Sequence, residues 1–177
     1  MKPILPVLLI VSAFSFSLNA KVVNVTSPDG KLNVTVSVSN KITYSVQHGD
    51  NILIDASPVS MKLTTGEVWG ENAKLLRTKR DSNRGSIDSP FGTSATIEDN
   101  YNEVTFSFRG NWALRFRVYD DGMAYRFINY CKETLFIESE EVSFRFPSDF
   151  TAYLPYVKKG GDQLQTSFEN VYTHTKL

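Results

Sequence analysis

The sequence contains very little cysteine and histidine. Its 177 residues include one cysteine, Cys131, and two histidines, His48 and His174. A single cysteine cannot form a disulfide within the chain, and a lone thiol is most simply a buried small hydrophobe. Neither histidine lies in a catalytic motif, and His and Cys do not occur at zinc-ligand spacing. Catalysis by a serine or cysteine nucleophile and a zinc site are therefore not indicated.

The chain also lacks an excess of charge of either sign. Its 19 Lys and Arg residues balance 19 Asp and Glu residues, so the formal net charge is zero. Proteins that bind nucleic acid through its phosphates concentrate basic charge. The glycines, in addition, do not form a phosphate-binding loop that leads into a helix. We therefore expect neither nucleic acid nor a nucleotide as a partner.

Only one long apolar stretch is present, at the N-terminus. Met1 and Lys2 precede an apolar run over residues 4–16 that serines interrupt. The run is shorter than the ~20 residues that a membrane span needs, and it is followed by Leu18, Asn19 and Ala20, a suitable cleavage site. We expect residues 1–20 to be a signal peptide of an exported, periplasmic chain without a stable membrane anchor. A retained anchor is the alternative. Residues 21–177 then make one domain.

A helical pattern is missing as well. No stretch after residue 20 keeps a 3.6-residue apolar period for three turns, whereas a period of two recurs. Short loops with glycine, such as Asp120-Asp121-Gly122, separate the alternating stretches, which predicts antiparallel pairing. The expected fold is therefore all-β, a large antiparallel β-sandwich with little helix. The predicted strands cover residues 32–38, 42–46, 104–108, 112–118, 123–127 and 142–146.

The segment from Arg77 to Thr96 fits this pattern poorly. It is polar and basic, with residues 79–85 reading Lys-Arg-Asp-Ser-Asn-Arg-Gly before Pro90 and Gly92. We expect a long solvated loop here. A role in binding an anionic ligand is the alternative.

Carboxylates do not indicate an enzyme by themselves. Asp120 and Asp121 lie in a predicted turn, and Glu138, Glu140 and Glu141 cluster between strands. Acidic residues at such places usually serve solubility and backbone hydrogen bonding. Glycoside hydrolysis needs two carboxylates about 5 to 9.5 Å apart, which sequence spacing in a strand-rich chain cannot establish.

Two tryptophans are candidates for stacking on a sugar ring. Trp69, within Val68-Trp69-Gly70, is the better candidate for exposure, but we expect packing in the core even here, because Trp is mostly buried in ordinary domains. Trp112 begins a stretch of alternating apolar residues, and we expect it in the core.

Five stretches together resemble one known family. They are Ser-Pro-Asp-Gly-Lys-Leu at 27–32, Phe91-Gly92 followed by Asp-Asn-Tyr-Asn-Glu at 99–103, the eleven residues 117–127, Phe-Arg-Phe-Pro-Ser-Asp at 144–149, and Tyr-Leu-Pro at 153–155. The order of these stretches and the eleven-residue block make the match specific. The sequence resembles the N-terminal domain of glycoside hydrolase family 97 over essentially all of residues 21–177.

The resemblance implies a super-sandwich that packs against a catalytic (β/α)8 barrel. Members of the family are exported bacterial α-glucosidases and α-galactosidases that depend on calcium and act on α-linked oligosaccharides. Their sandwich lends a glutamate to the calcium site, in a motif of an aromatic residue, Glu, two variable residues and Tyr. Residues 168–172 match this motif, which implies that Glu169 is a calcium ligand. A solvated glutamate near a chain end is the alternative.

The resemblance implies that the catalytic residues lie outside this chain. The barrel would carry the acid, the base and the other calcium ligands, so we expect the chain to stop before the barrel and to be inactive alone. Specificity for glucosides or galactosides, and inversion or retention, stay open. The alternative is a freestanding exported carbohydrate-binding β-sandwich without catalysis, which binds glycans through an aromatic face around Trp69. A third reading, a small hydrolase, lacks a nucleophile motif or a paired-acid motif.

Overall fold

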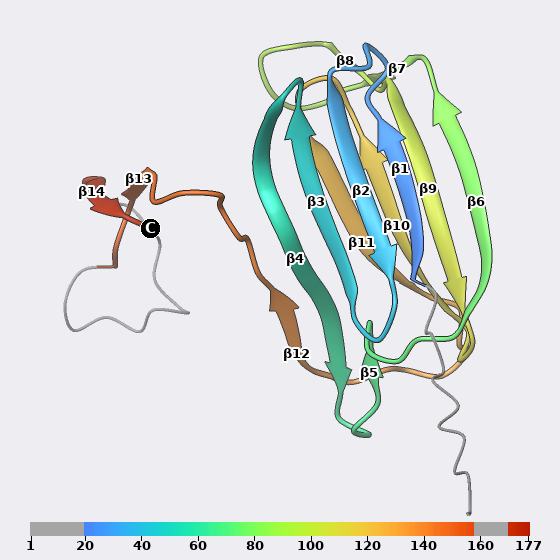
Figure 1. The fold of residues 1–177 in the computed structure, drawn as a ribbon. Coiled ribbons are helices and arrows are strands. Elements are labelled where there is room, and N and C mark those ends of the chain that lie inside the picture. Colours follow the sequence, from blue (N-terminus) through green and yellow to red (C-terminus); the bar gives the residue numbers. More distant parts are fainter. Residues whose placement is uncertain (1–19, 158–169) are drawn as a thin grey trace, which may run out of the picture.

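The computed structural model describes residues 20–157 and 170–177, and Figure 1 shows two antiparallel sheets that face each other. The first sheet has the order β1 (Lys21–Thr26), β2 (Leu32–Val38), β3 (Ile42–His48), β4 (Asn51–Leu63) and β12 (Ile137–Val142), with β5 (Val68–Trp69) also paired to β4. The second sheet has the order β11 (Met123–Asn129), β10 (Trp112–Val118), β9 (Tyr101–Phe108) and β6 (Leu75–Asn83). Two further pairs are β7 (Ser86–Asp88) with β8 (Thr96–Glu98), and β13 (Thr151–Leu154) with β14 (Thr173–Lys176).

The predicted all-β sandwich is confirmed. None of the described residues is helical, and thus the described part of the chain has no helix that could cross a membrane. The alternation has its expected physical result in β2, where the four apolar residues are buried and the three polar residues between them are partly exposed. Strands predicted at 32–38, 42–46, 104–108, 112–118 and 123–127 all occur.

Aromatic rings fill the space between the two sheets. Trp112 of β10 stacks on Trp69 of β5, with ring centroids 5.1 Å apart, and on Phe108 of β9 at 4.1 Å. Tyr44 of β3 meets Phe116 of β10 at 5.9 Å. Large rings contribute much of the buried apolar area of a core, so these contacts join the first sheet to the second.

Trp69 is therefore packed in the core, as expected for most tryptophans, and is not the exposed ring of a sugar platform. Its side chain is 2% exposed. β5 pairs with β4, with Trp69 opposite Met61, and this pairing turns the indole toward the second sheet. The indole cannot stack on a sugar, which removes the aromatic face that a freestanding carbohydrate-binding domain would use.

The expected loop at residues 77–96 is also wrong. β6 pairs with β9 along its length, from Leu75 opposite Phe108 to Asn83 opposite Tyr101, and β7 pairs with β8 beyond it. β6 is an edge strand whose side chains are mostly exposed. Backbone pairing needs no apolar alternation, and charged side chains on an edge strand discourage pairing with other molecules. A polar sequence is thus compatible with this strand.

Three other segments differ from the sequence expectations. The strand predicted at 142–146 is wrong: β12 covers Ile137–Val142 instead, so the glutamates expected between strands lie within a strand, and beyond it only an isolated bridge joins Arg145 to Asp55. β1 and the long β4 were not predicted, and the first half of β4 is mostly exposed although it contains Ile52, Leu53 and Ile54. Cys131 is half-buried rather than buried, with its Sγ 3.6 Å from the carbonyl oxygen of Gly110.

A close backbone contact fixes the turn after β5. Gly70 has φ +105°, and a Cβ built there would lie 2.4 Å from the carbonyl oxygen of Val59 in β4. The carbonyl oxygen of Gly70 accepts a hydrogen bond from the N–H of Ile42 at 2.9 Å. Only glycine fits, because any side chain would meet the backbone of β4.

We predict that Gly70→Ala lowers the free energy of unfolding by about 3 kcal/mol, from left-handed strain and overpacking together. Gly66→Ala is the matched control, because Gly66 has φ +89° but open space around its Cβ position. The control should lose only about 1 kcal/mol. Urea denaturation measures both values, and equal losses would show that the contact with Val59 does not matter.

Candidate functional site

Glu169, the residue expected to bind calcium, lies outside the described residues, but the chain just after it is described. The side-chain Nδ2 of Asn170 donates a hydrogen bond to the carbonyl oxygen of Tyr156 at 2.8 Å. In the β13–β14 pair, Tyr153 lies opposite His174, with ring centroids 4.3 Å apart. Figure 1 shows this pair apart from the two main sheets. Asn170, the residue that follows Glu169, therefore lies close to the chain just after β13.

The chain from Phe136 onward exposes many large apolar side chains. Among residues 20–157 and 170–177, 20 large hydrophobic residues are exposed, and 12 of them belong to residues 136–156 and 171–177, which we call the C-terminal apolar segment. They are Phe136, Ile137, Val142, Phe144, Phe146, Phe150, Tyr153, Leu154, Tyr156, Val171, Tyr172 and Leu177. Large apolar patches on the surface of a soluble protein usually mark a site of interaction. The C-terminal apolar segment is therefore a candidate interaction surface.

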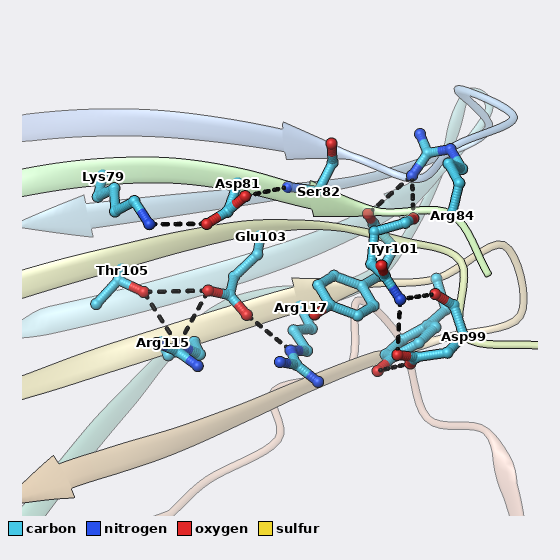
Figure 2. A network of polar contacts seen from close by, with 12 residues as sticks. Lys79, Asp81, Ser82, Arg84, Asp99, Tyr101, Glu103, Thr105, Arg115 and Arg117 are labelled. Carbon is cyan, nitrogen blue, oxygen red and sulfur yellow. Dashed lines mark hydrogen bonds and ion pairs between the residues drawn. The ribbon is translucent and has the colours of Figure 1, made fainter. Parts of the chain in front are cut away.

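A second feature lies on the outer face of the second sheet, where β9 and β10 carry paired charges (Figure 2). Glu103 of β9 is only 6% exposed. Its Oε1 lies 3.1 Å from Nε of Arg115, and its Oε2 accepts a hydrogen bond from Nε of Arg117 at 2.7 Å. Nε of Arg115 also donates to Oγ1 of Thr105 at 3.1 Å. We call Glu103, Thr105, Arg115 and Arg117 the polar network.

The position of Arg117 is further defined by two tyrosines. Its guanidinium carbon lies 4.0 Å from the ring centroid of Tyr101, a cation–π contact, and this ring meets that of Tyr119 at 5.4 Å. The hydrogen bond to Glu103 raises the pKa of the Arg117 guanidinium above its ordinary value, against the opposing effect of burial. Arg117 is therefore a fixed cation and cannot act as an acid or base at neutral pH.

The acidic clusters singled out from the sequence mostly hold the structure together. Oδ1 of Asp120 accepts a hydrogen bond from the N–H of Asp29 at 2.8 Å, which joins two distant turns. Glu138 pairs with Lys62 at 2.7 Å, and Glu141 accepts from Oγ of Ser60 at 3.1 Å. These contacts are structural and do not place two carboxylates across a substrate.

Hydrogen bonding and burial shift two further pKa values. Hydrogen bonds from the hydroxyl of Ser27 and then from the backbone of Lys31 hold the pKa of Asp29 well below its usual range. Burial, followed by the negative charge of Glu140, raises the pKa of Tyr125 to about 12. Neither group titrates near neutral pH, so neither is suited to proton transfer there.

The described residues do not form a metal site on their own. They contain no group of three or more His, Cys, Asp and Glu side chains that could hold a metal ion. His48 ends β3 and His174 lies in β14. Calcium takes six to eight oxygen ligands, so Glu169 could supply one of them and the others would have to come from elsewhere.

Comparison with known proteins identifies the family to which this domain is related. The model of a family described as Glycosyl-hydrolase 97 N-terminal matches residues 25–177. The chain belongs to this family. A retaining alpha-galactosidase of Bacteroides thetaiotaomicron is 43% identical over 156 residues, which are 85% of this chain and 24% of that protein. A probable retaining alpha-galactosidase of Streptomyces bingchenggensis is 26% identical over 141 residues, 77% of this chain and 22% of that protein.

Solved structures agree on the fold. A glycoside hydrolase family 97 enzyme from Pseudoalteromonas sp. strain K8, in complex with panose, superposes with a TM-score of 0.72 at 22% identity, over 86% of this chain and 24% of that one. A beta-arabinopyranosidase gives 0.74 at 25% identity, over 85% and 26%. The resemblance to the glycoside hydrolase family 97 N-terminal domain is thus confirmed, and the chain spans about a quarter of the length of these relatives.

The polar network was not predicted, although it joins two of the stretches that carry the resemblance. Glu103 ends the 99–103 stretch, and Arg117 begins the eleven-residue block. In β10, Arg115 and Arg117 alternate with Leu114, Phe116 and Val118, which is the available sequence signal. The identity of their partner depends on the pairing of β10 with β9, where Arg117 lies opposite Glu103.

We predict that Glu103→Gln lowers the free energy of unfolding by about 2 kcal/mol, because two partly buried guanidinium groups lose their carboxylate. The control is Asp81→Asn, since Asp81 and its partner Lys79 are both more than half exposed. The control should change stability by less than about 0.5 kcal/mol. If Glu103→Gln unfolds in urea at the wild-type midpoint, the polar network does not stabilise the sheet.

Proposed function

We propose that this chain is the N-terminal sandwich domain of an exported glycoside hydrolase that cleaves α-glucosidic or α-galactosidic bonds in α-linked oligosaccharides. The observation that carries the proposal is the family match over residues 25–177, in a chain that spans 24% of its 43% identical relative. That relative is a retaining alpha-galactosidase. The catalytic acid and base would come from a (β/α)8 barrel in the rest of the polypeptide.

The C-terminal apolar segment supports the proposal that a barrel, and not the sandwich, carries the catalytic residues. Phe144 is 53% exposed and Tyr153 is 58% exposed, although both lie in stretches that resemble the family. Leaving such side chains in water costs about 25 cal/mol for each Å² of apolar area, which a covering domain would recover. We propose that the barrel covers this segment and that the sandwich serves as a rigid support for it.

The sandwich would take part in the active site through Glu169. The described residues do not fit a complete calcium site, because they contain no cluster of acidic or other metal-binding side chains. The proposal therefore gives this chain one calcium ligand, the Glu169 carboxylate, and assigns the remaining ligands to the barrel. Bound there, calcium would supply positive charge next to the sugar.

The proposed place of action is the periplasm. The apolar run over residues 4–16 and the small residue Ala20 support cleavage of a signal peptide after residue 20. Oligosaccharide substrates outside the cytoplasm agree with export.

We expect the barrel to protect the C-terminal apolar segment from hydrogen exchange. In the complete polypeptide, amides of residues 137–157 should exchange at least about tenfold more slowly than in the 177-residue chain alone, because docking suppresses local opening. Amides of β2 and β10 form the internal control and should exchange alike in both. Equal exchange of residues 137–157 in the two proteins would contradict docking on this surface.

In the complete polypeptide, we predict turnover of aryl α-galactosides or α-glucosides with calcium, and Glu169→Gln should raise the calcium concentration for half-maximal activity at least about tenfold. Calorimetry should show the same loss in direct calcium binding. Glu133→Gln, which changes an exposed glutamate outside the motif, is the matched control.

The two parts of this proposal fail differently. An unchanged calcium dependence in Glu169→Gln would remove the ligand assignment alone. Absence of turnover on both glycosides by the complete wild-type polypeptide with calcium would contradict the enzymatic proposal itself.

A further inference from the structure

Two arginines lie directly opposite each other on the outer face of the second sheet. Arg115 of β10 and Arg126 of β11 are register partners in the antiparallel pair. Like charges in that position destabilise a sheet unless something of opposite charge lies between them. Arg126 is exposed and has no ion pair with any described residue, and Arg115 has only the buried Glu103. The positive charges of Arg115 and Arg126 are therefore not fully balanced by carboxylates of the described residues.

The same two side chains line a hollow in the surface. Its volume is about 210 Å³, which suits a small ion or a single sugar unit. The lining residues are Arg115, Arg117, Tyr119, Ala124, Tyr125 and Arg126. Three guanidinium groups therefore surround one cavity that has no carboxylate in its wall.

The polar network orients these guanidinium groups. Glu103 lies on the neighbouring strand and uses its two carboxylate oxygens on the Nε atoms of Arg115 and Arg117, as Figure 2 shows. Within the described part of the chain, the terminal nitrogens of Arg115 make no side-chain hydrogen bond. Asp81 of β6, a further carboxylate on this face, pairs with Lys79 at 2.8 Å. The donors of Arg115 and Arg126 remain available to a ligand.

We propose that Arg115 and Arg126, supported by Arg117, form a binding site for one oxyanion group, a carboxylate or a sulfate. Guanidinium groups recognise such groups through parallel hydrogen bonds, which fit the planar carboxylate and the sulfate edge. Tyr119 in the same wall provides a ring against which a sugar that carries the acidic group can lie. The lining residues of this site include neither Glu169 nor any residue of the C-terminal apolar segment.

The test is a titration of the 177-residue chain, followed by the NMR signals of the arginine Nε–H groups at constant ionic strength. Galacturonate and sodium sulfate are the probes, and galactose is the neutral control. We expect saturable shifts of the Arg115 and Arg126 signals with a dissociation constant on the order of 1 mM. Tighter binding of galacturonate than of sulfate identifies an acidic sugar as the ligand, and equal binding identifies a free inorganic anion.

Arg126→Gln should weaken binding of both probes about tenfold or more, because it removes charged hydrogen bonds from a side chain that holds no described structure together. Arg77→Gln is the matched control, since Arg77 lies on β6 of the same sheet and outside the cavity wall. The proposal is overturned if neither anion produces saturable shifts, if galactose binds as tightly as galacturonate, or if Arg126→Gln binds like the wild type.

Discussion

Burial of the inner face of β10 between the two sheets holds the rest of the domain in place. Trp112 stacks between Trp69 and Phe108, and Phe116 meets Tyr44 of the opposite sheet. A strand has a period of two, so burial of these side chains sends Arg115 and its neighbours to the outer face. The core and the charged outer face are thus two consequences of one strand, and a change of register by one residue would exchange them.

The outer face is organised around a single buried carboxylate. Glu103 satisfies two guanidinium groups on β10, and the ring of Tyr101 covers one of them. A buried carboxylate without these partners would be costly, so the strand pairing and the ion pairs support each other. The same arrangement leaves positive charge in excess beside β11, where Arg126 faces Arg115. Stability and the proposed anion site therefore rest on the same residues.

The sandwich and the C-terminal part of the domain differ in how far they bury their apolar side chains. The sandwich buries its apolar side chains, whereas 12 of the 20 exposed large hydrophobic residues lie in the C-terminal apolar segment. That segment also leads toward the motif that contains Glu169. The proposed barrel would account for this difference by covering the segment, in keeping with family membership and with a span of about a quarter of the relatives. Function then depends on what the sandwich supports more than on chemistry within it.

Local pattern in the sequence was sufficient for the all-β class and for five strands, because alternation and turn residues act between near neighbours. The family followed instead from the resemblance of five ordered stretches to a known family. The remaining features depend on partners far away in the chain. β6 is a strand in spite of its polar sequence because its backbone pairs with that of β9. Trp69 is buried because the pairing of β5 with β4 directs its indole toward Trp112. Phe144 and Phe146 alternate like strand residues, yet the sandwich does not cover them. The pairing of Arg115 with Arg126 and of Glu103 with Arg117 likewise required the tertiary structure, since strand register, not composition, determines which charges meet.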